Sequence, residues 1–374
     1  MPSSPTKMPP IPELSIIVPV LNEEERIERL LEGLDRQKGI VFEVILSDGN
    51  SRDETLRCAD RLHDRCHFDL RICTGKRGRG RQMNAGSAMA RGEWLLFLHA
   101  DTGFTDRHAL RTGLDALREA TGRNGHVLVA GHFALRFDDT SGMPRFGTCF
   151  CEGKARLNRP GCTLGDQGLM LSRDFFAKAG RYDESLPVAE DVLLAERIRE
   201  CGEFILLPAN ILTSPRRFYS EGYRERQTLN AMIMGLLFTG HAHFLDSLPG
   251  IYRSQDSCRR LYLEPFCREI GAKIARLSLR DRLTFWYRVG SYVRANAWQL
   301  AYALDLFRNY RKGMRAGEGE MPLLAWYDRY LDRLTNNPPG RVLATCLVWI
   351  WFGLTLQWSL LRHERKGNEK RAGS

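Results

Sequence analysis

Long apolar runs alternate with amphipathic segments over the first hundred residues. The run LSIIVPVL at 14–21 is nearly unbroken, which is typical of a parallel strand buried on both faces. Residues 22–34 follow with apolar side chains at helical spacing. Three further apolar runs, each next to a helical segment, occupy 41–48, 70–73 and 93–101. Strands that alternate with helices predict βαβ units, and hence an α/β fold with a mainly parallel sheet.

Polar residues mark the ends of these elements. The segments 22–25 and 51–54 both fit a capping box, in which a side chain at the start of a helix bonds to a backbone amide. Ligands of parallel α/β sheets bind beyond the carboxyl ends of the strands, so those ends indicate where a site lies. We expect four segments to lie along one edge of the sheet: 19–23, 48–51, 74–81 and 99–101.

The four segments carry complementary chemistry. Asp48 can accept hydrogen bonds from a base or a ribose. Basic side chains between glycines, which let the backbone approach a ligand, suit a diphosphate. Here they are Lys76, Arg77, Arg79 and Arg81. Asp101 and His99 offer the oxygen and nitrogen that suit Mn²⁺, and a metal on a diphosphate stabilises a departing nucleotide.

Each of these features also has a purely structural explanation. Asn22 and the glutamates after it can serve as helix caps and solvated helix surface. Asp48-Gly49 is a common turn. The basic loop at 76–81 matches neither G-x-G-x-x-G nor the P-loop, so it can be a solvated loop or a nucleic-acid patch. From the residues alone, both explanations stay open.

A second candidate group lies further along the chain. Glu190 and Asp191 follow Pro187 and fall in the first turn of a predicted helix, which Gly202 is placed to end. Carboxylates in this position can act as a general base, or can merely complement the helix dipole. The adjacent pair at 216–217 can grip a phosphate or stay solvated.

Charge divides the chain into two parts. The net charge is +10 over 374 residues, yet residues 251–374 alone hold 22 Lys and Arg against 11 Asp and Glu, and they contain six of the seven tryptophans. We therefore predict a Pro- and Ser-rich disordered start at 1–13, a sheet domain at 14–250 and a basic helical extension at 251–374. The ten cysteines include no C-x-x-C pair, which indicates reduced, intracellular thiols rather than a zinc site or a disulfide framework.

The extension contains one long uncharged stretch, VLATCLVWIWFGLTLQWSLL at 342–361. Its length permits a transmembrane helix. The five Lys and Arg beyond it favour a cytoplasmic C-terminus, and a single span would then place the sheet domain on the opposite side of the membrane. The alternatives are an interfacial helix on an anionic membrane and a helix packed on the protein. The apolar segment at 228–240 is too short to span and predicts a packing helix.

The order and spacing of these pieces resemble the family 2 glycosyltransferases, which have the GT-A fold. SIIVPVLNEEERI is similar to that family's first strand with its nucleotide contacts, and VILSDGNSRDET to its second strand. GRGRQMNAG with LLFLHADT resembles most closely the branch of radical-SAM/selenodomain-associated transferases. The resemblance runs from about Leu14 to Tyr252. It implies a GT-A, Rossmann-like and mostly parallel central sheet, followed by an α-helical C-terminal region.

The resemblance also implies roles for individual residues. Asp48 would bind the base, Arg81 and Asn84 would contact the diphosphate or sugar, and Asp101 would bind the metal. Where the family commonly has Asp-x-Asp, this chain has His99-Ala-Asp101. The expected donor site consists of Pro19, Asn22, Glu23, Asp48, Lys76, Arg81, Asn84 and His99, with His99 and Asp101 at a Mn²⁺ or Mg²⁺ ion.

The segment from Gly165 to Gly202 resembles the family's acceptor loop and base helix. It implies Asp191 as the catalytic base, with Glu190 as the second choice, and inversion at the anomeric carbon by a single displacement. The expected acceptor-side residues are Gly165, Asp166, Gln167, Arg216 and Arg217. The sequence SPRRFYSEG stands where processive synthases carry Gln-x-x-Arg-Trp, so we expect transfer of a single sugar.

These observations predict a metal-assisted, inverting glycosyltransferase that uses a nucleotide-sugar donor. We expect it in the cytoplasm or peripheral at the cytoplasmic face of an anionic membrane, with a lipid or a small molecule as acceptor. The alternative is a non-catalytic nucleotide- or lipid-binding scaffold that keeps the fold. Nucleic-acid binding is least expected, because residues 1–250 carry a net charge of only −1.

Overall fold

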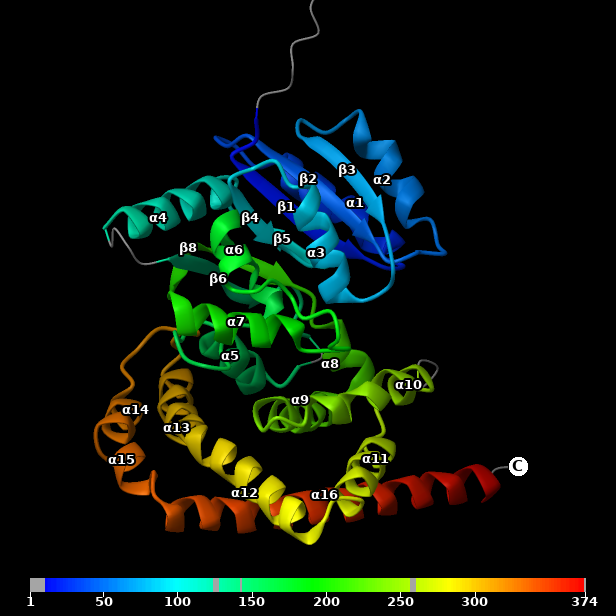
Figure 1. Ribbon diagram of the computed structural model, residues 1–374, viewed down its shortest axis with the longest axis vertical. Helices are drawn as coiled ribbons and strands as arrows, with labels where there is room; N and C mark the ends of the chain where they lie inside the picture. The colour runs from blue at the N-terminus through cyan, green and yellow to red at the C-terminus, as the bar shows by residue number, and fades with distance from the viewer. Residues whose placement is uncertain (1–10, 124–127, 142, 256–259, 373–374) are drawn as a thin grey trace, which may run out of the picture. The chain divides into compact units, whose positions relative to one another are not determined.

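The computed structural model describes residues 11–123, 128–141, 143–255 and 260–372 (Figure 1). The chain forms two compact units. The sheet unit comprises residues 1–138 and 154–214, and the helical unit comprises residues 139–153 and 215–374. Most of the predicted disordered start, residues 1–13, lies outside the described residues.

One mixed sheet organises the sheet unit. Within the described residues it has eight strands in the order β3-β2-β1-β4-β7-β6-β8-β5. The first four in that order run parallel, which confirms the predicted parallel strands, while β7 is antiparallel to β4 and β5 to β8. The strands are β1 (Leu14–Val20), β2 (Phe42–Asp48), β3 (Asp69–Thr74), β4 (Trp94–Phe97), β5 (Thr102–Phe104), β6 (Val129–Phe137), β7 (Leu169–Ser172) and β8 (Glu203–Thr213).

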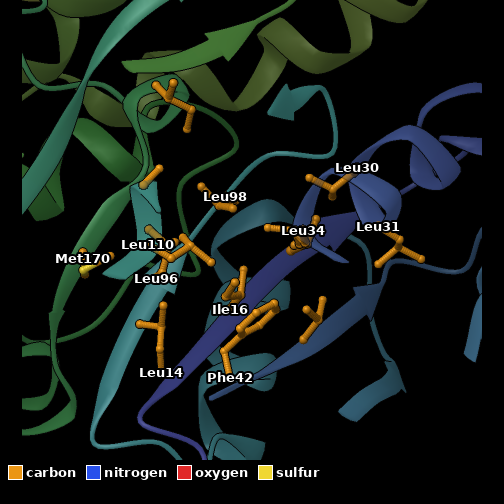
Figure 2. Packing of buried hydrophobic residues seen from close by; sticks show 14 of the residues in the cluster. Leu14, Ile16, Leu30, Leu31, Leu34, Phe42, Leu96, Leu98, Leu110 and Met170 are labelled. Atoms are coloured by element: carbon orange, nitrogen blue, oxygen red, sulfur yellow. The ribbon is translucent and has the colours of Figure 1, made fainter. Parts of the chain in front are cut away.

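Helices cover both faces of this sheet, and alternate residues of each strand pack on opposite sides. Ile16 of β1 belongs to a buried cluster with side chains of α1 (Glu24–Asp35), α2 (Thr55–His63) and α4 (Ala109–Arg123), part of which Figure 2 shows. Its neighbour Ile17 belongs to a second buried cluster on the other face. The helices that contribute to that second cluster are α3 (Arg79–Met89), α6 (Arg173–Lys178) and α7 (Glu190–Cys201).

The carboxyl ends of the first three strands meet at one edge of the sheet, as predicted. The register pairs Val20 with Asp48, and Asp48 with Thr74. Gln82 of α3 reinforces this edge, because its Nε2 donates to the carbonyl of Val20 at 2.9 Å and to that of Ser47 at 2.7 Å. The side chain is buried, so it satisfies two strand-end carbonyls that have no access to water.

The predicted capping boxes are wrong. Helix α1 begins at Glu24, and Asn22 lies before it in the left-handed region with φ 55°. Its Oδ1 accepts from the amide of Arg52, and the Oγ of Ser51 accepts from the amide of Asn22. The polar side chains of these two segments therefore tie the β1–α1 loop to the β2–α2 loop, because both loops lie at the same sheet edge.

Two predicted boundaries also shift. Helix α3 begins at Arg79, so Arg79 and Arg81 lie in its first turn, although the sequence placed both in a basic loop at 76–81. Strand β4 ends at Phe97, and residues 99–102 form a tight turn in which Thr102 Oγ1 donates to the carbonyl of His99 at 2.7 Å. The predicted end of α7 is correct, since Gly202 is its C-cap.

The helical unit contains the helices predicted for residues 255–335 and the packing helix predicted for 228–240. Its division from the sheet unit falls at Ser214–Pro215, whereas the change in charge predicted a boundary near residue 250, which lies within a helix. Charge marks surface composition, but a unit is defined by its packing. The helices are α5 (Arg145–Lys154), α8 (Arg216–Glu221), α9 (Tyr223–Phe238), η2 (Ala242–Ser247), α10 (Leu248–Arg253), α11 (Glu264–Ala275), α12 (Leu279–Ala295), α13 (Trp298–Arg311), α14 (Pro322–Trp326), η3 (Tyr327–Leu331), α15 (Asp332–Thr335) and α16 (Pro338–Ala372).

A close approach explains why residues 139–153 belong to the helical unit. Tyr302 of α13 is fully buried, and its hydroxyl donates to the carbonyl of Phe150 in α5 at 3.4 Å. A Cβ on Gly153 would lie 2.4 Å from that hydroxyl oxygen. Only glycine therefore leaves room for the tyrosine, and α5 and α13 pack as one core.

The buried imidazole of His132 in β6 makes the stability of the sheet unit depend on pH. Burial lowers the pKa of this side chain to about 4, against about 6.5 for a free histidine. The unfolded chain therefore binds a proton that the folded chain does not, and the free energy of unfolding falls as the pH drops from about 6.5 to 4. When the pH falls from 7 to 4.5, the free energy of unfolding should decrease in both proteins, and the decrease should be about 2 kcal/mol smaller in His132→Gln than in the parent.

Urea unfolding of both proteins at the two pH values measures this difference. His108→Gln is the control, because it removes an exposed imidazole from the same unit. Equal losses of stability in His132→Gln and the parent would contradict the assignment.

Candidate active site

The first turn of α3 packs directly on the start of α7. A Cβ on Gly80 would lie 3.0 Å from the carbonyl oxygen of Asp183, 3.4 Å from Cβ of Tyr182 and 3.5 Å from Cγ of Glu190. In the same helix, a Cβ on Gly86 would lie 2.6 Å from Cγ2 of Ile17 in β1. These glycines therefore allow α3 to approach its neighbours closely, so their role is packing rather than the approach of backbone to phosphate.

Arg79 and Glu190 form an ion pair where α3 meets α7. Glu190 is only 2% exposed, so its charge depends on this partner. Burial opposes the charge of Arg79, but the carboxylates of Glu190 and Asp191 outweigh it and hold the pKa of the guanidinium above its usual range. Burial and the same two carboxylates raise the pKa of Tyr182 well above its usual value. Arg79, which the sequence offered as a diphosphate ligand or part of a solvated loop, therefore balances a group of acidic side chains.

The η1 turn (Gly165–Gln167) brings the remaining acidic side chains to this place. Asp191 Oδ2 accepts a hydrogen bond from the amide of Gly165 at 2.7 Å, and His99 Nδ1 lies 2.9 Å from Asp166 Oδ1. A Cβ on Gly165 would lie 2.7 Å from Asp191 Oδ2 and 2.8 Å from His99 Nε2. These two atoms are therefore within 5.5 Å of each other, the largest separation that the two distances allow.

A cavity of about 540 Å³ lies on the other side of the α3 N-terminus. Three predicted donor-site residues line it, namely Lys76, Arg81 and Asn84. Arg181 and Glu184 line it too, and the sequence did not indicate them because they lie in a loop that folds back onto α3. Asn84 fixes that loop, since its Nδ2 donates to the carbonyl of Tyr182 and to Glu184 Oε1, both at 2.9 Å.

Asp48 shapes the rim of the site. Its carboxylate is 1% exposed and accepts hydrogen bonds from the amides of Asn50 and Ser51, both at 3.0 Å. Asp48 and Gly49 therefore form the turn that was one of the two explanations of this pair. The turn lies next to the cavity, because the amide of Gly75, which lines the cavity, donates to the carbonyl of Asp48. Pro19 lies half-buried near the end of β1. The backbone amide of Glu23 donates to Thr55 Oγ1 at 2.8 Å, which fixes the position of this residue.

Backbone strain is concentrated around this site. Among the described residues, four that are not glycine have positive φ: Asn22, Asn50, Arg181 and Ala189. Asn22 and Asn50 follow β1 and β2, Arg181 lines the cavity, and Ala189 directly precedes Glu190. A left-handed conformation costs roughly 1–2 kcal/mol for such residues. Costs of this kind are commonly found at functional sites, where the surrounding structure enforces the geometry.

Three predicted acceptor-side residues remain to be placed: Gln167, Arg216 and Arg217. Gln167 was expected to line the acceptor pocket, but it is 1% exposed and its Nε2 donates to the carbonyl of Cys162 at 2.7 Å. Its side-chain amide therefore supports the η1 turn from inside the core. Arg216 and Arg217 lie in α8 of the helical unit, where Arg216 is half-buried and Arg217 exposed.

The site has the donor atoms that a divalent cation needs. His99 Nε2 is buried and has no hydrogen-bond partner within the described residues. Because Asp166 accepts from Nδ1–H, Nε2 is left with its lone pair, which is the usual arrangement of a histidine that binds a metal. No group of three His, Cys, Asp or Glu able to hold a metal occurs in the described part of the chain. Divalent cations at phosphate sites commonly take only one or two protein ligands and complete their shell with phosphate oxygens and water, so the buried, unbonded Nε2 of His99 is a donor atom of the kind that such an ion needs.

Comparison with known proteins identifies the family. The model of glycosyl transferase family 2 matches residues 15–177. A PGL/p-HBAD biosynthesis glycosyltransferase of Mycobacterium tuberculosis is 37% identical over 181 residues, which make up 48% of this chain and 67% of that protein. The chain belongs to glycosyltransferase family 2. It is therefore a glycosyltransferase, as its sequence predicted.

Other similar proteins support the fold. A GalNAc(5)-diNAcBac-PP-undecaprenol beta-1,3-glucosyltransferase of Campylobacter jejuni is 27% identical over 222 residues, and the chain spans only 59% of its length. The structure of a mannosyltransferase from Pyrobaculum calidifontis in complex with GDP-Man and Mn²⁺ covers 93% of this chain and 87% of its own, with a TM-score of 0.50 and 18% identity. The predicted GT-A fold is confirmed, with a helical C-terminal region. The resemblance to the radical-SAM/selenodomain-associated branch stays a prediction.

The Arg79–Glu190 pair leads to a prediction about stability. Arg79→Met leaves the carboxylate of Glu190 buried and unpaired, and should lower the free energy of unfolding by about 3 kcal/mol. Arg81→Met is the matched control, because Arg81 lies in the same turn but is exposed, and it should cost less than about 0.5 kcal/mol. The double variant Arg79→Met with Glu190→Gln should recover part of the loss. Urea unfolding measures all three, and similar losses for Arg79→Met and Arg81→Met would show that the pair has no such role.

Proposed function

We propose that this enzyme transfers one sugar from a nucleotide-sugar donor to an acceptor hydroxyl, with inversion at the anomeric carbon. The observation that carries the proposal is the arrangement at the α3 N-terminus, where a basic cavity adjoins a group of carboxylates that includes Asp191. A donor diphosphate in the cavity would bring its sugar toward those carboxylates. Lys76 and Arg81, which the sequence offered as donor contacts, line this cavity and support the proposal.

The donor site would consist of cationic side chains and of two loops with fixed backbone conformations. Lys76, Arg81 and Arg181 provide three cationic side chains around one cavity, which suits the diphosphate of a nucleotide sugar. Asp48 and Asn22 hold the two loops at the sheet edge in fixed conformations. We propose that the nucleoside lies against these loops, with Pro19 and Glu23 beside it.

Asp191 is the proposed catalytic base. Glu190 is buried and paired with Arg79, so it is not available to take a proton. Asp191 is half-buried, and while its Oδ2 accepts from Gly165, its Oδ1 makes no hydrogen bond within the described residues. This oxygen would take the proton of the acceptor hydroxyl as that oxygen attacks the anomeric carbon. The bond from that carbon to the diphosphate breaks in the same step, and the nucleoside diphosphate leaves.

His99 and Asp101 are the proposed protein ligands of a Mn²⁺ or Mg²⁺ ion. Such an ion would supply positive charge to the departing diphosphate. Asp166 would orient the imidazole by accepting from Nδ1–H, which turns Nε2 toward the ion. Gly165 would keep the space beside Nε2 open, because any larger residue would place a Cβ 2.8 Å from that atom.

A lipid-linked acceptor is supported by the names of relatives. One is described as acting on a diphosphate-linked undecaprenol, and a human relative that is 35% identical over 128 residues is a dolichyl-phosphate beta-glucosyltransferase. We propose an acceptor of this chemical class for this chain, and with it a position at the cytoplasmic face of a membrane, where nucleotide sugars are available.

Replacing the proposed base should separate binding from transfer. Asp191→Asn keeps an oxygen that can accept from Gly165, so we expect donor affinity within about twofold of the parent. Transfer should fall by about 10²–10⁴, since the variant cannot take a proton. Initial rates of nucleoside diphosphate release with acceptor, together with donor titration, measure the two effects. Glu200→Gln, an exposed change in the same helix, is the control, and parental transfer by Asp191→Asn would refute the assignment.

The metal ligands can be tested without turnover. Donor binding stabilises the folded state in proportion to the logarithm of its concentration over Kd. We expect UDP-, GDP- or dTDP-sugars to raise the Tm, and Mn²⁺ to increase that rise. In Asp101→Asn and His99→Gln the increase from Mn²⁺ should be lost, while the rise from donor alone should stay. An increase that survives in both variants would exclude these residues as ligands.

A further inference from the structure

Helix α16 packs on the helical unit along one narrow side. A Cβ on Gly290 of α12 would lie 2.5 Å from Cα of Thr345, so the two helix backbones are nearly in contact there. The ring of Phe352 lies 5.6 Å from that of Trp286 in an edge-on arrangement. Ala344, Val348 and Ser359 are buried on the same side. Figure 1 shows α16, in red, running alongside α12 and α11.

The opposite side of α16 is apolar and exposed over the same length. Its residues, here called the outer face, are 39–62% exposed. They are Val342, Leu343, Leu347, Trp349, Ile350, Trp351, Leu354, Trp358 and Leu361. Five of them recur at positions 343, 347, 350, 354 and 361 and form a stripe along the helix axis. A contiguous exposed apolar surface of this kind marks an interaction site.

The packing of α16 does not suit a transmembrane span. By length and composition it is the one described helix that could cross a membrane, although only 17% of its most apolar stretch is buried in the protein. Its inner side contacts α12 from the turn at Thr345 to the turn at Phe352. A span would therefore draw α12 into the bilayer with the charges that this helix carries: Arg280, Asp281, Arg282, Arg288 and Arg294. Each arginine at mid-bilayer is costly, whereas a helix that lies in the membrane plane would bury only the outer face.

The charge of the surrounding chain identifies the partner. Residues 251–374 carry twice as many basic as acidic side chains, and Arg268, Arg276, Arg280 and Arg288 of α11 and α12 or the turn between them are exposed. An apolar, Trp-rich face on a unit with this excess of basic side chains complements an anionic bilayer. A second copy of this chain would bring equal positive charge to the same place, which disfavours self-association through this face.

We propose that the outer face of α16 binds an anionic membrane surface, with the helix axis in the plane of the membrane and its inner side held by α11 and α12. Tryptophans at both edges of the face would lie at the level of the lipid headgroups. Membrane binding through this face needs neither donor nor acceptor. The membrane proposal can therefore fail while the proposed sugar transfer is correct, and the sugar transfer can fail while the membrane proposal is correct.

Vesicle flotation of the full chain tests the surface. The parent should bind phosphatidylcholine vesicles that contain phosphatidylglycerol, and bind pure phosphatidylcholine much more weakly. Leu347→Gln with Leu354→Gln should weaken binding at least about tenfold, because two large apolar side chains no longer enter the bilayer. Val41→Gln with Leu206→Gln, two exposed apolar positions of the sheet unit, is the matched control and should bind like the parent.

Several outcomes would overturn the proposal. They are absence of vesicle binding by the parent, equal binding to neutral and anionic vesicles, and equal loss in the outer-face and control variants. A parent that is dimeric without lipid, and monomeric with Leu347→Gln and Leu354→Gln, would assign the face to a second copy instead. Unchanged Tm values confirm that the variants are folded, as expected for exposed side chains.

The depth of two tryptophans distinguishes a helix in the membrane plane from a span. Trp351 and Trp358 are seven residues apart, or about 10 Å along the helix axis, so they lie on the same side of the helix, and both are exposed. In the plane of the membrane both would be quenched best by lipids brominated near the headgroup. The quenching lost in Trp351→Phe and in Trp358→Phe should therefore show the same shallow depth. Depths that differ by about 10 Å would contradict the proposal and indicate a span.

Discussion

The contact between α3 and α7 is the constraint on which the candidate site depends. Gly80 lets the two helices meet, and the Arg79–Glu190 pair joins them where both helices begin. Glu190 has almost no access to water, so its carboxylate depends on the guanidinium of Arg79, which is partly exposed. This contact places the basic cavity on one side of the α3 N-terminus and the carboxylates of Asp166 and Asp191 on the other. A shift of α3 would therefore move the donor pocket and the proposed base relative to each other.

The same contact divides the roles of neighbouring residues of one chemical type. Of two adjacent glutamate and aspartate side chains, Glu190 is neutralised by an arginine and Asp191 keeps one oxygen unbonded within the described residues. Of two arginines in one helical turn, Arg79 faces carboxylates and Arg81 faces the cavity. The helical period sets this division, because residues two apart point to different sides of a helix. In each pair, one side chain stabilises the contact between the helices and the other is left to bind a ligand.

Much of the fold was predictable because buried strands have a strong signal. The run at 14–21 has one polar residue, and that at 41–48 has five apolar residues with its serine and aspartate at the strand end. The parallel pairing of β1 and β2 follows from the helix between them. Side-chain partners were not predictable in the same way. Gln167 looked like a pocket residue, yet it bonds a carbonyl inside the core, and Arg79 looked like a phosphate ligand, yet it pairs with a residue 111 positions away. Such partners depend on tertiary contacts between distant segments, which local patterns do not contain.

The exposed side of helix α16 was likewise not predictable from its sequence. Its stretch at 342–361 carries no charge on any side, which by itself fits a buried or membrane-spanning helix. Packing makes it two-sided, because α12 covers the side of Ala344 and Val348 and leaves the side of Leu347 and Leu354 exposed. Its amphipathic character thus arises from tertiary structure and not from residue order. A hydropathy profile measures only how much apolar surface a helix has, and the neighbouring helices decide how much of it a membrane can reach.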